Sequence, residues 1–293
     1  SKNNSMVESL PEGIDKIQIG SGVYNVKSYA EVGKPYGAIY AKTFKRDAEG
    51  YILCQLDGSP KEGQDYEYLG CVQADWRGGW NNVFRLGNFS FSVMFDFQKG
   101  GKFFSQTSIQ SSVDGQSVKS LEGRDADFFS RKILGESDEE RYGFMRPQNA
   151  NTPTANGQIY PDWGRPKGVV LPNCRYDEDV EGLAGQQVLG YCTPERYWMH
   201  YTSRDISRFI YDASYVKLRE ITVSYDLPKK WLRKTPFQTF RVAAVGRNIA
   251  TLFANTPHGL DPQATSTTGN AQGFERGFNL PSATYGFDIK VSF

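Results

Sequence analysis

The chain has 293 residues, a formal net charge of +1 and 39% hydrophobic residues. This near-neutral balance provides no basic field that would recruit nucleic acid, and no apolar run of about 18 residues occurs, which excludes membrane-spanning helices. The composition is compatible with a transmembrane β-barrel, because the strands of a barrel need an apolar residue only at every second position.

Short strands bounded by turn residues follow one another through the first hundred residues. We expect strands at 23–32, 38–44, 51–56 and 66–72, each ending at Gly, Pro, Asp or Asn. Residues 80–86 and 88–98 then form the clearest hairpin, which turns at Gly87 and Asn88. The N-terminal 20 residues are polar and are expected to be peripheral.

The second strand of this hairpin alternates over its whole length. One face carries Phe89, Phe91, Val93, Phe95 and Phe97, and the other is polar apart from Met94. Such alternation fits a soluble sandwich as well as a membrane barrel. The length of about ten residues favours a barrel, because a tilted strand that crosses a bilayer needs about 9–11 residues and soluble strands average about 5–6.

The middle of the chain, about 99–210, has a different character. It is rich in Gly, Pro, Asn, Asp and Ser, with a helix expected near 125–134 and a short strand near 197–201. We interpret it as one or two long extracellular loops. Four aromatic residues in or near it are candidate substrate-binding residues, either for a sugar ring or for a peptide side chain: Trp163, Tyr191, Tyr197 and Trp198. Packing inside the loops is the simpler alternative for each of them.

Regular strands are expected again at 214–227 and 240–250. The segment 228–236 between them contains Lys229, Lys230, Arg233 and Lys234. This basic connector would be a short periplasmic turn that is solvated or faces phospholipid headgroups. A loop rich in Gly, Pro, Asn and Thr follows at 251–281.

The last strand, 283–293, carries the clearest membrane pattern. Its apolar face holds Tyr285, Phe287, Ile289, Val291 and Phe293, which we predict to face lipid in a barrel-closing strand. Asp288 and Lys290 fall on the opposite face. A Lys on the lipid face near the midplane would cost roughly 2–4 kcal/mol, so the alternation places both charges on the wet side.

The sequence offers no catalytic or metal-binding constellation. No pair of carboxylates can be nominated for glycoside hydrolysis, and the two histidines, His200 and His258, lie far apart. We therefore expect no enzyme activity, no metal and no cofactor. The four cysteines, Cys54, Cys71, Cys174 and Cys192, lack a C-x-x-C pair. Two local disulfides, within the first and within the second pair, and buried thiols both remain open.

Several segments along the chain share motifs with one known protein family. Residues 212–228 read DASYVKLREITVSYDLP, which resembles the signature ASYVKLRNITLGYTLP of the SusC/RagA family of TonB-dependent transporters. Residues 241–248 and 259–262 resemble the segment LRVYVSGQNL…GLDPE, and 281–293 resemble the closing strand P…TFGLNVTF. Upstream, 33–50 and 75–79 resemble G.PYG.IYG…RDAEG and PDW.GG, with Ala74 where the family usually has Pro. The matches occur in the family order and leave the middle loop unmatched.

The resemblance implies an all-β fold, the C-terminal portion of a large antiparallel barrel of the 22-stranded type with long extracellular loops. The whole chain, 1–293, would be one barrel segment with strands at about 22–98 and 196–293 and contribute about eight to ten strands. The plug and the N-terminal strands would be absent or belong to another chain.

The resemblance also implies a function and its partners. We expect outer-membrane import of a glycan in a Gram-negative bacterium, together with a SusD-like surface lipoprotein and energised through the plug by TonB–ExbB–ExbD. Outer-membrane lipid would surround the barrel, and no nucleic acid is expected. Oligopeptides are the alternative cargo. A secreted all-β carbohydrate-binding module is the alternative from another class.

Overall fold

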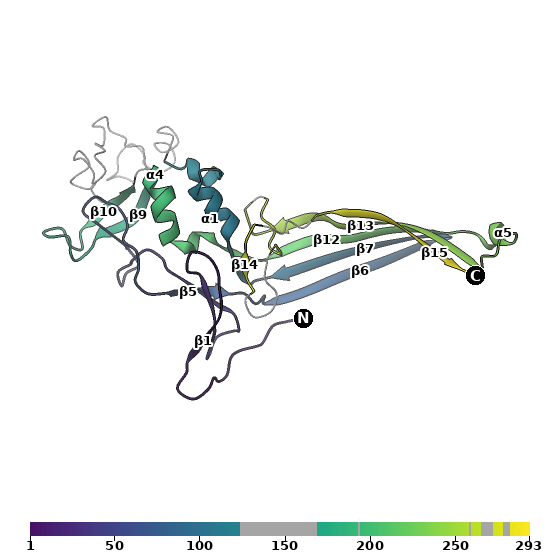
Figure 1. Cartoon of the computed structure of the whole chain (residues 1–293), viewed down its shortest axis with the longest axis horizontal. Helices are drawn as coiled ribbons and strands as arrows, with labels where there is room; N and C mark the ends of the chain where they lie inside the picture. Colours follow the sequence, from purple (N-terminus) through teal and green to yellow (C-terminus); the bar gives the residue numbers. More distant parts are fainter. Residues whose placement is uncertain (124–168, 193, 258, 265–271, 278–281) are drawn as a thin grey trace.

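The computed structural model describes residues 1–123, 169–192, 194–257, 259–264, 272–277 and 282–293. Within them the chain is mostly β-sheet (Figure 1). The strands are β1 (Lys16–Ser21), β2 (Lys27–Glu31), β3 (Ala38–Ala41), β4 (Ile52–Cys54), β5 (Glu67–Cys71), β6 (Trp76–Leu86), β7 (Phe89–Lys99), β8 (Lys102–Ser105), β9 (Val169–Tyr176), β10 (Gln187–Cys192), β11 (Ile210–Asp212), β12 (Tyr215–Asp226), β13 (Thr239–Ala254), β14 (Phe274–Glu275) and β15 (Thr284–Ser292).

Helical segments are few and short. They are α1 (Gln106–Val113), η1 (Val118–Leu121), α4 (Pro194–Arg196), η2 (Tyr197–Tyr201), η3 (Thr202–Arg204), η4 (Ile206–Phe209) and α5 (Lys229–Leu232). None of the helices in the described part of the chain has the length and apolarity needed to cross a membrane.

Five long strands form one antiparallel sheet in the order β15-β13-β12-β7-β6. The sheet extends away from the rest of the molecule as a long blade (Figure 1). At its far end, β6 and β7 are joined by Gly87 and Asn88 alone, with Leu86 opposite Phe89. Gly87 has a φ of +58°, the conformation that a two-residue type II′ hairpin requires at its first position.

The other end of the blade joins a head built from three small sheets, β1-β2-β3-β5, β10-β9-β4 and β11-β8-β14. Its two apolar cores hold the largest buried side chains, among them Phe44, Tyr197 and Trp198 in one and Ile39, Phe104 and Phe274 in the other. Ser105 begins α1 as its N-cap, and its hydroxyl accepts a hydrogen bond from the backbone N–H of Ser108. The first residues of the chain lie against the blade, where the backbone of Lys2 forms an isolated antiparallel β-bridge with Trp76 of β6.

The head differs from the sequence-based expectation in two ways. Residues 22–72 build small sheets of the head and do not continue the blade, and the region 99–210 contains β8 to β11 and helical turns where long loops were expected. The strand predicted near 197–201 is wrong, because η2 is helical and Tyr197 and Tyr201, one turn apart, are both buried in a core. The helix expected near 125–134 lies outside the described residues.

Candidate functional site

The long sheet has one continuous apolar face, which the strand register defines. Residues directly opposite one another on neighbouring strands share a face. One row of such residues across all five strands is Leu86, Phe89, Tyr225, Val242 and Ile289. The next row is Phe84, Phe91, Val223, Ala244 and Phe287. The alternation seen in single strands is therefore aligned across the blade.

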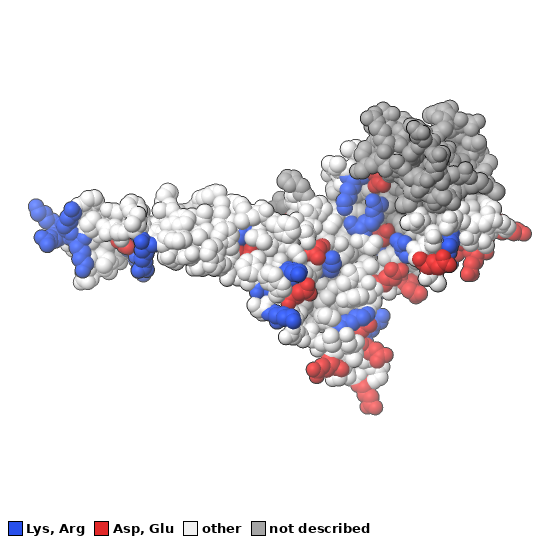
Figure 2. Space-filling model, turned by 180° about the vertical axis from the view of Figure 1, so that it is seen from behind, with Lys and Arg blue, Asp and Glu red and all other residues white. Residues whose placement is uncertain are grey.

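This apolar face is uncovered. Leu86 is 83% exposed, Phe84 55% and Phe287 86%. Figure 2 shows that the middle of the blade carries no Lys, Arg, Asp or Glu on the visible side. A soluble sandwich would bury such a face against a second sheet, and no second sheet covers it within the described residues.

The opposite face of the same sheet is polar. A row across four strands holds Ser90, Ser224, Ala243 and Asp288, and the neighbouring row includes Ser92 and Thr222. Two ion pairs lie on this face: Arg247 Nε lies 2.9 Å from a carboxylate oxygen of Glu220, and Arg241 Nε lies 2.6 Å from one of Asp226. One sheet thus presents an apolar surface and a hydrophilic surface back to back.

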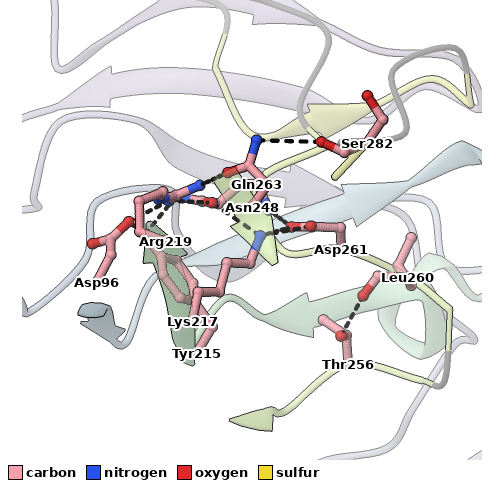
Figure 3. A network of polar contacts seen from close by, with 10 residues as sticks. All are labelled: Asp96, Tyr215, Lys217, Arg219, Asn248, Thr256, Leu260, Asp261, Gln263 and Ser282. Atoms are coloured by element: carbon pink, nitrogen blue, oxygen red, sulfur yellow. Dashed lines mark hydrogen bonds and ion pairs between the residues drawn. The ribbon is translucent and has the colours of Figure 1, made fainter. Parts of the chain in front are cut away.

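A polar network closes the end of the sheet near the head (Figure 3). Lys217 of β12 is 5% exposed, and its ammonium lies 2.6 and 2.5 Å from the two carboxylate oxygens of Asp261 and 2.9 Å from Oε1 of Gln263. Both partners belong to the loop after β13. The buried charge is therefore compensated by this loop.

Arg219 extends the network to the neighbouring strands. Its guanidinium donates to Oδ1 of Asn248 on β13 (2.7 Å), to Oε1 of Gln263 (2.7 Å) and to Asp96 on β7. The Tyr215 hydroxyl donates to the same Asp96 carboxylate over 3.2 Å. These contacts fasten the segment 259–264 to β12, and Arg219 links β12 in turn to β7 and β13.

A cavity of about 370 Å³ lies beside this network. The polar groups that line it come from both the blade and the head, and they include Arg77, Gln98, Lys102, Tyr215 and Gln263. Gln98 and Tyr215 are paired across β7 and β12, and Gln98 is paired with Arg77 across β6 and β7. The cavity therefore opens on the polar side of the sheet. Hydrogen-bond donors dominate its lining.

The four candidate substrate-binding aromatics fall in different environments. Trp163 lies outside the described residues, and the backbone of Tyr191 is in β10 opposite Val170. Tyr197 and Trp198 are each only 1% exposed. Burial raises the pKa of Tyr197 to about 12, and the indole N–H of Trp198 donates to the Glu122 carbonyl over 3.1 Å. The structure places these two rings in a core, where they pack against the protein.

The five residues predicted to face lipid belong to β15 or directly follow it. Tyr285, Phe287, Ile289 and Phe293 are 76, 86, 62 and 76% exposed, and Val291 is half-buried opposite Phe240. Contact with lipid stays a prediction.

The cysteines form neither of the local disulfides considered from the sequence. Instead, the thiols of Cys54 and Cys174 meet across β4 and β9, and this hydrogen bond together with burial raises the pKa of Cys54 well above its usual value. Among the described residues, no group of three or more His, Cys, Asp or Glu side chains is arranged to hold a metal ion.

Known proteins similar to this chain were found in both sequence and structure. No family model matches the sequence. TonB-dependent receptor P3 of Formosa agariphila is 22% identical over 307 aligned residues, which cover 97% of this chain and 24% of the relative. The solved structure of the RagAB peptide transporter matches with a TM-score of 0.51 and 14% identity, covering 98% of this chain and 26% of that chain. The chain thus spans about a quarter of the length of either protein. The first is named a receptor and the second a transporter.

Proposed function

We propose that this chain forms part of the wall of a large outer-membrane barrel that imports an oligomeric nutrient. The sequence motifs and these two comparisons support the view that it is a segment of a SusC/RagA-type TonB-dependent transporter. The observation that carries the proposal is the uncovered apolar face of the blade, set back to back with a polar face. Lipid would cover the first, and the water-filled lumen would adjoin the second.

Strand length agrees with this placement. The five strands of the blade have 11, 11, 12, 16 and 9 residues, and a tilted strand needs about 9–11 to cross the hydrocarbon layer. A soluble carbohydrate-binding module would have to leave Leu86, Phe84 and Phe287 in water. Each such side chain forgoes roughly 1.5–3 kcal/mol that burial would provide.

The connections suggest how the blade is oriented. At one end the strands are joined by Gly87–Asn88 and by the connector that contains α5, whereas at the other end the chain passes through the whole head. Short turns face the periplasm and long loops face outward in barrels of this kind. The head would then lie outside the cell, where a SusD-like lipoprotein would close over it. TonB, ExbB and ExbD would act through a plug contributed by another part of the transporter.

A glycan is our first candidate for the cargo. The polar face presents the hydroxyl groups of Ser90, Ser92 and Thr222, and the donor-lined cavity adds the amide groups of Gln98 and Gln263. Such groups hydrogen-bond sugar hydroxyls. Trp163 and Tyr191 stay our candidates for aromatic contacts with the cargo, whereas the buried Tyr197 and Trp198 would act only indirectly, as part of the core of the head. Oligopeptides are the second candidate, because the matching fold is that of a peptide transporter.

Deletion of the gene in its host tests this function. The deletion strain is expected to lose growth on one class of oligomer, supplied as the sole source of carbon or nitrogen, and to keep growth on the corresponding monomers. Loss on oligosaccharides alone supports glycan import, and loss on oligopeptides alone supports the second candidate. Unchanged growth on both, with the protein recovered from the medium and not from the outer membrane, would contradict transport and favour the secreted module.

A further inference from the structure

The far end of the blade carries a cluster of positive charge. Lys229, Lys230, Arg233 and Lys234 are all exposed, and they lie on or directly after α5. Figure 2 shows a basic group at the tip of the blade, beyond the stretch that carries no charge. We call residues 229–234 the basic turn.

Aromatic side chains accompany this charge. Trp231 stands within the basic turn and is 61% exposed, whereas the next residue, Leu232, is 6% exposed and anchors α5. The ring of Phe237 lies 5.9 Å from that of Phe240 and 5.3 Å from that of Phe293 between centroids. The apolar face of the blade thus ends in aromatic rings immediately before the cations.

The four cations have no acidic partners in the described part of the chain. Asp226 is the nearest acid by sequence, and both of its carboxylate oxygens are engaged by Arg241, over 2.6 and 2.8 Å. The basic turn therefore carries four positive charges without acidic partners among the described residues, all at the tip of the blade. Exposed lysines usually alternate with acids, and an unbroken group of one sign attracts an anionic surface.

We propose that the basic turn binds the headgroups of anionic phospholipids in the inner leaflet of the outer membrane. This inference rests on the proposed function, which places the tip at the periplasmic surface of the bilayer. Trp231 and the rings of Phe237, Phe240 and Phe293 would then lie at the membrane–water interface, which aromatic side chains favour. The lysines and Arg233 lie just beyond it, where each cation near an anionic surface strengthens binding about fivefold. Arg233 can also hold a phosphodiester with two parallel hydrogen bonds.

The order of groups along the blade favours a lipid over an acidic protein segment. The apolar face, the aromatic rings near the tip and the cations follow one another along the sheet. The acyl chains, the glycerol and the phosphate of a phospholipid follow one another in the matching order. An acidic peptide would need the cations but would gain nothing from their alignment with an apolar face that is already in lipid.

The test uses the full-length protein as the cell makes it, reconstituted in bilayers of equal parts phosphatidylglycerol and phosphatidylcholine. The variant Lys229→Gln, Lys230→Gln, Arg233→Gln, Lys234→Gln removes the charge. A matched control, Lys229→Arg, Lys230→Arg, Arg233→Lys, Lys234→Arg, keeps it at the same positions. The measurement is the ratio of the two lipids that remain bound after mild delipidation, determined by mass spectrometry.

We expect the wild type and the charge-conserving control to retain phosphatidylglycerol in preference, and the glutamine variant to lose at least about tenfold of that preference. An unchanged preference in the glutamine variant would overturn the inference and leave an acidic periplasmic protein as the partner of the turn. Displacement of the lipid by inorganic phosphate would overturn it in favour of a soluble anion. Insertion into pure phosphatidylcholine is independent of the turn, so failure to insert there contradicts the membrane wall itself, and the inference falls with it.

Discussion

The Lys217 ammonium is buried beneath the loop after β13, and Asp261 is its main counter-charge at 2.5 Å. Removing one partner of a buried pair leaves the other charge without compensation. We expect Asp261→Asn to cost about 2–4 kcal/mol, below the largest values for such pairs because the Asp261 side chain is 16% exposed. Thermal unfolding in detergent and proteolysis of the segment 255–264 would measure the loss.

Two further variants separate charge compensation from general damage. Lys217→Met combined with Asp261→Leu removes both charges and is expected to recover most of the stability. Glu220→Gln breaks the more exposed pair with Arg247, whose side chain is 66% exposed, and should cost less than about 1 kcal/mol. Equal losses in Asp261→Asn and Glu220→Gln would show that the network does not hold the loop.

Asp177 gives the head a pH-dependent stability. Burial raises the pKa of its carboxyl group, but hydrogen bonds from Lys45 and Lys61 outweigh burial and bring the pKa to about 2. Because this pKa lies below the unfolded value of about 3.9, the stabilisation is complete above pH 5 and is lost as the pH falls toward 2. It amounts to at most about 2 kcal/mol, discounted for the partly exposed Lys45.

The variant Asp177→Asn should therefore be less stable than wild type at pH 7, and the difference should shrink by about half at pH 3. Asp179→Asn is the control, because Asp179 also contacts Lys61 but is 69% exposed. Thermal unfolding of the head, followed by circular dichroism at both pH values, is the measurement. A difference that stays constant between pH 7 and pH 3 would rule out this role of the carboxylate.

At the scale of single elements, β15 offers a direct test of its two faces. Phe287→Lys places a charge on the apolar face and is expected to cost roughly 2–4 kcal/mol if that face meets lipid. Asp288→Lys introduces the same residue one position further on, opposite Ala243 on the polar face, and should be tolerated. The fraction of protein that assembles in the outer membrane would show the difference. Similar assembly of both variants would argue that neither face is in lipid.

The strands of the blade could be predicted from the sequence because period-two alternation over nine or more residues is a strong local signal. The register that aligns Phe89 with Tyr225 was not predictable, since it depends on pairing between distant segments. The conformation of the aromatic run Tyr197, Trp198 and Tyr201 was predicted wrongly for a related reason. A short aromatic run fits a strand, a binding platform or a core helix equally well, and only its tertiary neighbours decided for burial.

At the scale of the whole molecule, the motifs predicted the kind of protein but not the extent of the sheet. Segments 23–32, 38–44 and 51–56 carry short apolar runs that suit any sheet, so they read as further barrel strands. In the structure these runs pair with one another and with β9, and β3 and β4 are buried throughout. A strand that is buried on both faces cannot separate lipid from a lumen. Strands of the head therefore differ from strands of a barrel wall in their burial, which short apolar runs in the sequence do not reveal.

The blade as a whole predicts how the 293-residue chain behaves in solution. Its apolar face is uncovered, and β6 and β15 are the edges of its sheet in the described structure, so buffer alone leaves both apolar groups and unpaired backbone groups in water. We expect the chain to elute as aggregate in buffer and as a dispersed species in neutral detergent on size-exclusion chromatography. The head alone cannot produce this result, because its large side chains are buried in two cores. A monodisperse monomer in buffer without detergent would contradict the membrane wall and restore the soluble module.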